Sequence, residues 1–451
     1  MSASPSAKTL AIADRLVTMA RAGEQLEAYV ASGNSTGVRA YDGDVESFTQ
    51  AASAGVGVRI IVDGRQGFAS AGTFDDLVLA EVVAEARDNA RFAECDPHVA
   101  LAVPDGVVAA PLDLWRDESL DLSPDAKIQL ALDLEARVRG ADPRISGVRV
   151  SAYGDSFGER AIASTTGVRV GERATYCSLS VTALARDGEH TTIGGGVSLG
   201  RSPAELELDR AADDAVGRAL RMLGATQPRS ERLAIVLEPR LAASVLGIIG
   251  GTLSGEAVAK GRSPFADRVG EAVAATSFTL FDDPTDARSF GAGEYDGEGV
   301  AYRRVPLVLD GVLQGFLHNT YSAARAATTT TASAVRGARS TPGVGAAALA
   351  VVPGAGDLAS LTAGIDHGLL VHSLAGLHSG VNAVSGDFSV GVEGLMIRNG
   401  ELGEPVREAT IASTIPRLLT HLAAIGADLE WQPGGIGAVT LVVEDVTLSG
   451  A

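Results

Sequence analysis

The chain has 451 residues, of which 46% are hydrophobic and 4% aromatic, and it carries 37 basic against 56 acidic side chains. A chain of this length usually divides into two domains, and a net charge of −19 disfavours a surface for nucleic acid or anionic lipid, because both repel an acidic field. No apolar run is long enough to span a membrane, and the N-terminal residues lack the pattern of a signal peptide. We therefore expect a cytoplasmic protein that binds neither nucleic acid nor membranes.

The first half of the chain predicts antiparallel hairpins between helices. Asp42-Gly43 and Asp63-Gly64 are hairpin signals, because a type I′ turn needs positive φ at both central residues. Ser123 is the expected N-cap of a helix, since a proline follows it at the first helical position. The expected helices are residues 6–22, 74–92, 124–139 and 203–223, and the expected strands are residues 26–32, 35–51 and 55–72 with a meander over 145–199.

Residues 224–232 are polar and contain Gly and Pro, so we place a linker there, between an N-terminal domain over 1–223 and a C-terminal domain over 233–451. The first expected elements of the second domain are a buried strand and a helix. Its further expected strands are residues 304–318, 347–354, 368–376, 387–406 and 438–450, and its further expected helices are residues 357–364 and 415–425. The predicted fold class is therefore α+β, with an N-terminal α/β domain of antiparallel hairpins before a strand-rich, barrel-like C-terminal domain.

The glycine-rich segment over 246–271 raises the question of a phosphate or metal site. A Walker loop is excluded, because Lys260 stands five residues after Gly255 and is followed by Gly261 instead of Ser or Thr. The two cysteines, Cys95 and Cys177, lie far apart and outside any CxxC pattern, which argues against a structural zinc cluster.

Two further groups of residues are candidate metal sites. His372 and His378 are six residues apart, and a turn at Gly376 would bring them together near Asp387; the alternative is a strand end and a loop with solvated imidazoles. A second group is acidic and lies among glycines that argue first for a mobile loop: Glu294, Asp296 and Glu298.

Several long motifs resemble those of the TldD/PmbA family, once called modulators of DNA gyrase and now regarded as zinc metallopeptidases. The N-terminal pieces are "STGVRAYDGDVES" and "GVGVRIIVDGRQGFAS", and the more specific C-terminal pieces are "SPFADRVGE", "GDFSVGVEGLMIRNGELGEPV" and "TLVVEDVTLSG". The resemblance implies a family with two branches that pair as a heterodimer. The TldD branch carries an HExxxH helix and a cysteine near its C-terminus as zinc ligands, with the glutamate as base, and the TldE branch lacks them.

This chain is similar to the TldE branch. Counting back from the shared "SPFADRVGE" run places the first histidine on Leu246, the glutamate on Gly247 and the second histidine on Gly251, and the C-terminal cysteine is absent. Neither Leu nor Gly can bind zinc or carry a proton. The resemblance therefore implies no catalytic residue, metal or cofactor on this chain, with zinc on a TldD-type partner. We also expect Gly251 to lie in a turn that needs positive φ.

The resemblance implies a subunit of a metallopeptidase that degrades or matures small or unfolded peptides, which it holds as an added strand. The expected residues of the substrate cleft are His318, Thr320, Tyr321, Gly386, Asp387, Phe388 and Ser389, although Gly386-Asp387 also fits a simple turn. One alternative is a self-sufficient hydrolase rebuilt from His318, His372, His378 and Asp387. The other is a peptide-binding homodimer without hydrolytic activity.

Overall fold

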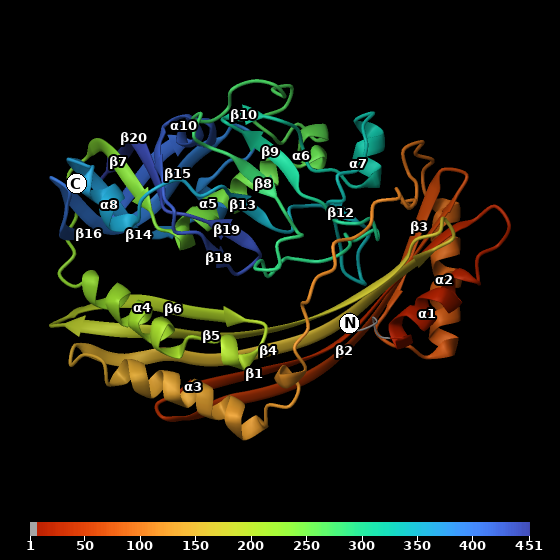
Figure 1. The fold of residues 1–451 in the computed structure, drawn as a ribbon, viewed down its shortest axis with the longest axis horizontal. Helices are drawn as coiled ribbons and strands as arrows, with labels where there is room; N and C mark the ends of the chain where they lie inside the picture. The colour runs from red at the N-terminus through yellow and green to blue at the C-terminus, as the bar shows by residue number, and fades with distance from the viewer. Residues whose placement is uncertain (1–6) are drawn as a thin grey trace.

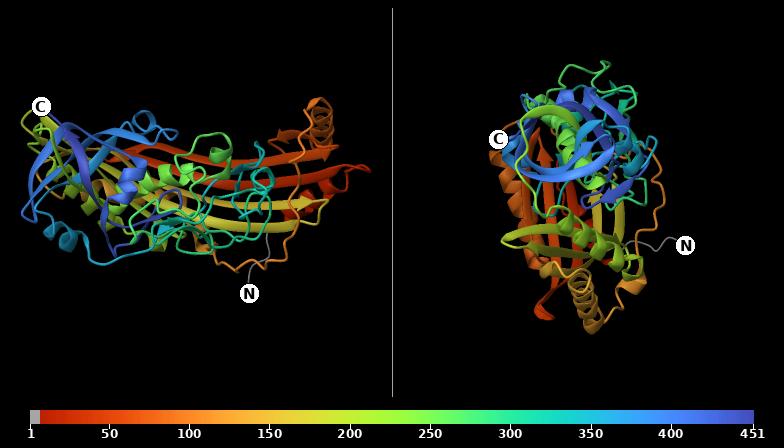
Figure 2. Two further views of the ribbon diagram at one scale, coloured as in Figure 1. Left: turned by 90° about the horizontal axis from the view of Figure 1, so that it is seen from above. Right: turned by 90° about the vertical axis from the view of Figure 1, so that its left-hand side faces the viewer.

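A computed structural model describes residues 7–451, in which a long curved sheet carries helices on one face and a second domain on its concave face (Figures 1 and 2). The sheet is antiparallel and has the order β3-β2-β1-β4-β5-β6. Its strands are β1 (Gln25–Tyr41), β2 (Asp44–Val62), β3 (Arg65–Ala71), β4 (Ile145–Ser164), β5 (Arg169–Asp187) and β6 (His190–Gly200). The first three correspond to the expected hairpins, and Asp42 and Gly43 have the positive φ angles, 57° and 81°, that the turn requires.

The helices of this half all cover one face of the sheet, because alternate residues of the central strands contact them. In β1, for example, Leu26 and Val30 pack on α1 and α2, whereas Val38 packs on α3. The helices are α1 (Ala7–Val17), α2 (Asp76–Phe92), α3 (Pro124–Arg139) and α4 (Leu208–Arg221), with short 3₁₀ turns at Asp117–Ser119 and Pro203–Glu205. The Ser123 side chain caps α3 as expected. Three of the expected helices differ in extent: the first ends at Val17, the second begins at Asp76, and the one expected over 203–223 is a 3₁₀ turn followed by α4, which ends at Arg221. Ser6, the first expected residue of the first helix, lies outside the described residues.

A closed barrel forms the centre of the C-terminal domain, which confirms the barrel-like prediction. Its strands follow the order β16-β15-β14-β7-β20, and a β16–β20 pairing closes the ring. They are β7 (Glu231–Leu237), β14 (His367–Ala375), β15 (Asp387–Arg398), β16 (Glu401–Thr414) and β20 (Leu441–Ser449), with β17 (Leu422–Ile425) attached to β20. The helix α5 (Pro239–Thr252) contributes Leu241, Val245 and Leu246 to the core that the inward barrel residues share.

A second six-stranded sheet and several short helices complete this domain. The sheet has the order β10-β9-β8-β13-β19-β18, and its strands are β8 (Leu280–Asp282), β9 (Val305–Leu309), β10 (Val312–Leu313), β13 (Leu349–Val351), β18 (Glu430–Gln432) and β19 (Ile436–Ala438). The remaining elements are the β11–β12 pair (Ala334–Val335 and Gly343–Val344) and the helices α6 (Gly255–Ala259), α7 (Thr320–Arg325), α8 (Leu358–Ala363), α9 (Leu377–Gly380) and α10 (Ile415–Thr420).

The expected helix over 415–425 is wrong beyond Thr420. The chain turns at His421, and the apolar run that follows becomes β17, because its residues pair with β20 and complete the same core. The expected linker over 224–232 likewise ends early, since β7 begins at Glu231. Among the described residues, no helix is long and apolar enough to cross a membrane.

A buried ion-pair network joins the two halves of the chain. Arg59 of β2 contacts Glu27 of β1 at 2.9 Å and Glu298 of the C-terminal half at 3.2 Å. Arg336 adds a second guanidinium to Glu27, and the side chains of these four residues are each at most 4% exposed. The second oxygen of Glu298 accepts from the backbone N–H of Thr320 at 2.9 Å. The network therefore fixes the start of α7 relative to the long sheet.

Candidate functional site

The three positions that the resemblance assigns to the HExxxH motif all lie within α5. Leu246 is fully buried in the hydrophobic core, Gly247 is half-buried and Gly251 is exposed. The nearest atom to a Cβ built at Gly247 is Cδ1 of Ile436, at 3.1 Å. These positions offer no nitrogen, sulfur or carboxylate donor, so the residues present do not fit a zinc ion. Among the described residues, no group of three or more His, Cys, Asp or Glu side chains is placed to hold a metal ion.

The expectation that Gly251 adopts positive φ is wrong. Gly251 lies in the last turn of a regular helix, and the glycines with positive φ do not include it. A Cβ added at Gly251 would meet no other atom within 4 Å. Gly247, Gly250 and Gly251 therefore belong to a helix and not to a turn, whereas Gly261 and Gly270, later in the same segment, do have positive φ.

His318, Thr320 and Tyr321 lie together at the beginning of α7. His318 is buried against Gly255, its Nδ1 lies 3.2 Å from Oγ of Ser322, and burial lowers the pKa of its imidazole. The Ser322 hydroxyl also completes the capping box of α7 with Asn319, so its hydrogen bonds have a structural role. The arrangement thus explains how α7 begins.

Two pockets flank α7 and contain some of the expected cleft residues. One, of about 450 Å³, is lined by Tyr321, whose hydroxyl donates to Asp96 of the N-terminal half at 2.8 Å. The other, of about 550 Å³, is lined by His318 together with apolar residues such as Val258 and Phe316. Neither pocket is lined by residues 386–389, so the structure does not join the two groups of expected cleft residues there.

Residues 386–389 form the entry to β15. Gly386 has φ of 80°, Asp387 is hydrogen-bonded to Ser385 at 2.6 Å, and Phe388 is buried in the core of the barrel. Only Asp387 and Ser389 are exposed. The alternative interpretation of Gly386-Asp387 as a turn accounts for this geometry.

The acidic loop uses its carboxylates for internal structure. Asp296 is buried and accepts from the backbone N–H groups of Glu298, Val300 and Ala334 at 2.9–3.0 Å. Burial and the neighbouring Glu298 raise the pKa of Asp296 to about 7. Glu294 accepts from the backbone N–H of Leu112. The loop is therefore held by hydrogen bonds instead of being mobile.

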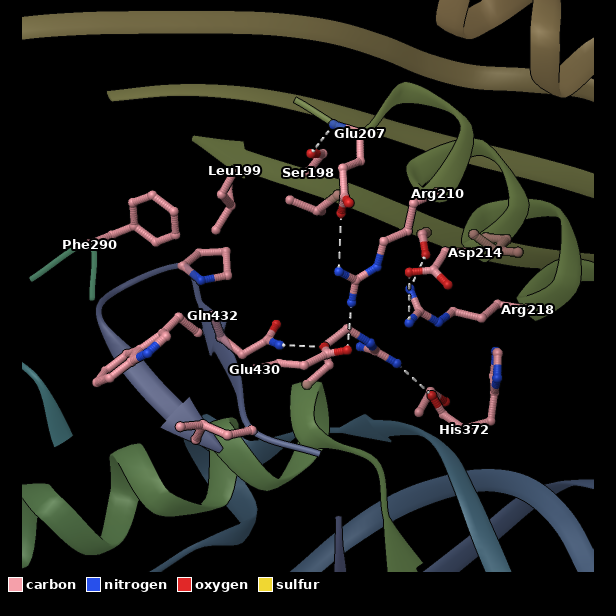
Figure 3. Close-up of a pocket in the computed structure, with 18 of the residues that line it drawn as sticks. Ser198, Leu199, Glu207, Arg210, Asp214, Arg218, Phe290, His372, Glu430 and Gln432 are labelled. Carbon is pink, nitrogen blue, oxygen red and sulfur yellow. Dashed lines mark hydrogen bonds and ion pairs between the residues drawn. The ribbon is translucent and has the colours of Figure 1, made fainter. Parts of the chain in front are cut away.

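A larger pocket, of about 640 Å³, lies between the two halves of the chain and was not predicted (Figure 3). We call it the interdomain pocket. Strand β6, the edge of the long sheet, and helix α4 form one wall; residues of α5, β14, β15, β18 and the loop at Phe290 form the other. Its lining residues are Ile193, Gly195, Val197, Ser198, Leu199, Glu207, Arg210, Asp214, Arg218, Arg240, Phe290, His372, Ser373, Glu393, Leu429, Glu430, Trp431, Gln432 and Pro433.

One end of the interdomain pocket is rich in arginine. Arg218 of α4 donates to the backbone carbonyl of Gly195 at 2.7 Å, and Arg240 of α5 donates to the backbone carbonyl of His372 at 2.9 Å. Burial, followed by the charges of Arg221 and Arg240, lowers the pKa of His372 to about 4. The imidazole is therefore neutral at pH 7, and the positive groups around it are the guanidinium groups.

The other end of the interdomain pocket is apolar. Leu199 and Phe290 lie opposite Gln432 of β18, as Figure 3 shows, and the same strand contributes Trp431 to the lining. Between the two ends, Arg210 of α4 reaches across the pocket and pairs with Glu207 of its own helix and Glu430 of β18. This bridge is half-exposed, so it contributes little to stability, but it sets the spacing of the two walls.

The sequence carries little signal for this pocket, because its charged residues come from separate elements that only the domain packing brings together. His372 and His378, the candidate metal pair, lie apart in character: His372 is buried in this pocket, whereas His378 is exposed on α9. His318 lines a different pocket at α7. The set of His318, His372, His378 and Asp387 therefore does not form the rebuilt site of the hydrolase alternative.

Comparison with family models matches three successive parts of the chain. Residues 26–90 match domain 1 of the PmbA/TldA metallopeptidases, residues 117–223 match the central domain, and residues 230–450 match the C-terminal domain. Among curated proteins, metalloprotease PmbA of Escherichia coli O157:H7 is 25% identical over 407 residues, covering 89% of this chain and 88% of that protein. Metalloprotease MJ0996 of Methanocaldococcus jannaschii is 22% identical, with 94% of each chain covered.

Solved structures share the whole fold. A protein of Bacteroides thetaiotaomicron described as a modulator of DNA gyrase superimposes with a TM-score of 0.90 at 26% identity, over 99% of this chain and 100% of that one. TldE of Thermococcus kodakarensis superimposes with a TM-score of 0.88 at 22% identity, over 98% of this chain and 99% of that one.

Proposed function

Because the chain belongs to the PmbA/TldD metallopeptidase family, we propose that it is a TldE-like subunit that binds no catalytic zinc and acts in the cytoplasm with a TldD-type partner. The observation that carries the proposal is the chemistry of α5. The positions of the two histidines and the glutamate hold a buried leucine and two glycines. In this proposal the partner supplies the zinc and cleaves small or unfolded peptides, and the present chain helps to enclose and hold them.

Two features of this chain support a peptide-holding role. Strand β6 is an edge of the long sheet, and an edge strand can pair with an extended peptide through backbone hydrogen bonds. Side chains of the same strand, Ile193 and Val197, are 50% and 42% exposed and line the interdomain pocket. An apolar surface of this kind binds peptides with loose sequence preference, which suits a protein that handles unfolded chains.

Mixing the purified chain with the HExxxH-containing relative encoded in the same genome tests the proposal. We expect neither protein alone to cleave an unfolded test peptide at a substantial rate, and we expect the equimolar mixture to cleave it in a chelator-sensitive manner. The matched control is the same mixture with the partner's HExxxH glutamate changed to Gln, which should be inactive. A mixture no faster than the partner alone, or chelator-sensitive cleavage by this chain alone, would contradict the proposal.

A further inference from the structure

Arg240 is a partly buried guanidinium without an opposite charge. Within the part of the chain that the structure describes, no carboxylate lies within 4.0 Å of it, and its one hydrogen bond goes to the backbone carbonyl of His372. Its Nε atom is buried and makes no hydrogen bond. A guanidinium has five N–H groups, and a buried charge is costly unless it is paired. Arg240 therefore favours an anion in the interdomain pocket.

The surroundings of Arg240 strengthen this preference. Arg218 also has a buried Nε without a partner, although its Nη2 lies 3.3 Å from Asp214. His372 is only 5% exposed, and its Nδ1 makes no hydrogen bond within the described residues. Arg218 of α4, Arg240 of α5 and His372 of β14 thus line one end of the pocket, and each has a nitrogen atom without a hydrogen-bond partner (Arg218 and His372 are labelled in Figure 3).

The acidic residues that line the pocket are already engaged, including Asp214 at the arginine end, which pairs with Arg218 at 3.3 Å. Glu207 and Glu430 pair with Arg210 in the middle of the pocket, and Glu393 accepts from Ser373 at 3.0 Å. They leave the arginine end positive but would repel a ligand that carried several negative charges. Beyond them lies the apolar end with Phe290 and Trp431. The pocket as a whole suits a ligand that has one negative charge and an apolar group.

We propose that the interdomain pocket binds the C-terminal end of a peptide, with the free carboxylate at Arg240, Arg218 and His372 and an apolar side chain toward Phe290 and Trp431. The peptide would run beside Ile193 and Val197, the exposed side chains of β6. The volume of the interdomain pocket, about 640 Å³, is within the usual range of about 300–1,000 Å³ for small-ligand sites. This inference rests on the proposed function, because it specifies which part of a peptide this subunit recognises.

Calorimetric titration of the full chain with a short alanine peptide that ends in phenylalanine tests the inference. The peptide is used both as the free acid and as the C-terminal amide. Because a hydrogen-bonded charged group contributes strongly to affinity, the acid should bind about ten- to a hundredfold more tightly than the amide. Arg240→Met should remove this difference, whereas Arg398→Met, which alters an exposed arginine paired with Glu404, should preserve it.

A second readout uses His372 itself. Burial, followed by the charges of Arg221, Arg240 and Arg218, holds its pKa low, and a bound carboxylate should raise it, since an opposite charge favours the protonated imidazole. Histidine NMR spectra should show this shift with the acid peptide but not with the amide, and His372→Gln identifies the signal. This comparison in the unaltered chain remains decisive if Arg240→Met fails to fold.

Three results would overturn the inference. They are equal affinity for the acid and the amide, a difference that survives in folded Arg240→Met, and displacement of the peptide by inorganic phosphate at comparable affinity. Failure of the proposed function is distinguishable, because it is measured as cleavage by the mixed subunits and not as binding to this chain. If this chain binds the acid peptide more tightly than the amide but does not activate a partner, only the proposed function is contradicted.

Discussion

Replacing Arg59 by Met is expected to destabilise the protein by about 3–5 kcal/mol, because it leaves buried carboxylates with too few partners. Arg59 contacts both Glu27 and Glu298, and the side chains of all three residues are at most 4% exposed. Arg336 would then be the remaining guanidinium that pairs with Glu27, and Glu298 would keep only the backbone N–H of Thr320. The change in the free energy of unfolding is measured by urea denaturation, monitored by circular dichroism.

The matched control is Arg398→Met, which breaks an ion pair whose side chains are about half exposed. Surface pairs of this kind contribute about 0–1 kcal/mol, so the control should unfold close to the unaltered protein. Since the Arg59 network joins the long sheet to the start of α7, Arg59→Met should also increase hydrogen exchange at Thr320. Equal urea-denaturation midpoints for Arg59→Met and Arg398→Met would show that the buried network does not hold the domains together.

The triple variant Leu246→His, Gly247→Glu, Gly251→His is expected to lose stability and to gain no peptidase activity. Leu246 is fully buried, and replacing a buried leucine by a polar ring costs about 2–5 kcal/mol. The two new histidines would be five residues apart on a regular helix, which places them about 140° apart around its axis. One would point into the core and the other to solvent, so they would share a zinc ion only if the helix widened locally, and the third ligand, the C-terminal cysteine, would still be absent.

Gly251→His alone is the control for this variant. It adds the same ring at an exposed helical position where an added Cβ meets nothing within 4 Å, so it should leave the melting temperature nearly unchanged. Melting temperature and bound zinc are measured for both variants. Chelator-sensitive peptide cleavage by the triple variant on its own would mean that the three lost side chains alone account for the missing catalytic site, and that neither the helical geometry of α5 nor the absent cysteine prevents zinc binding.

Local sequence signals predicted much of the fold. The Asp-Gly pairs placed the turns, because few residues adopt the left-handed conformation that a two-residue hairpin needs. The end of the helix at Thr420 was missed, since residues 422–425 are an apolar run that fits a helix or a strand until β20 lies beside it. Gly194 and Gly196 allow α4 to pack closely on β6, where added Cβ atoms would come within 2.1 and 1.8 Å of α4 carbonyl oxygens.

The candidate site was predicted less well than the fold. The three positions that the resemblance assigns to the lost motif, Leu246, Gly247 and Gly251, all lie in α5, but the sequence did not predict the regular helix that makes Leu246 part of the core. The interdomain pocket could not be predicted, because Arg218 and Arg240 look like ordinary surface arginines until the two domains meet. Lack of a partner for a charged group is a property of the packed chain and leaves no mark in the sequence.

The zinc content of the purified chain tests most directly whether catalysis depends on metal held by another subunit. The chain should be produced in zinc-supplemented medium, separated from loosely bound metal by gel filtration, and analysed by mass spectrometry beside the HExxxH-containing relative treated in the same way. We expect the relative to retain zinc and this chain to retain none in stoichiometric amount, because Leu246 and Gly251 of α5 stand where the two histidine ligands would be, and neither can bind a metal. One tightly held zinc ion per chain in this protein would contradict that conclusion.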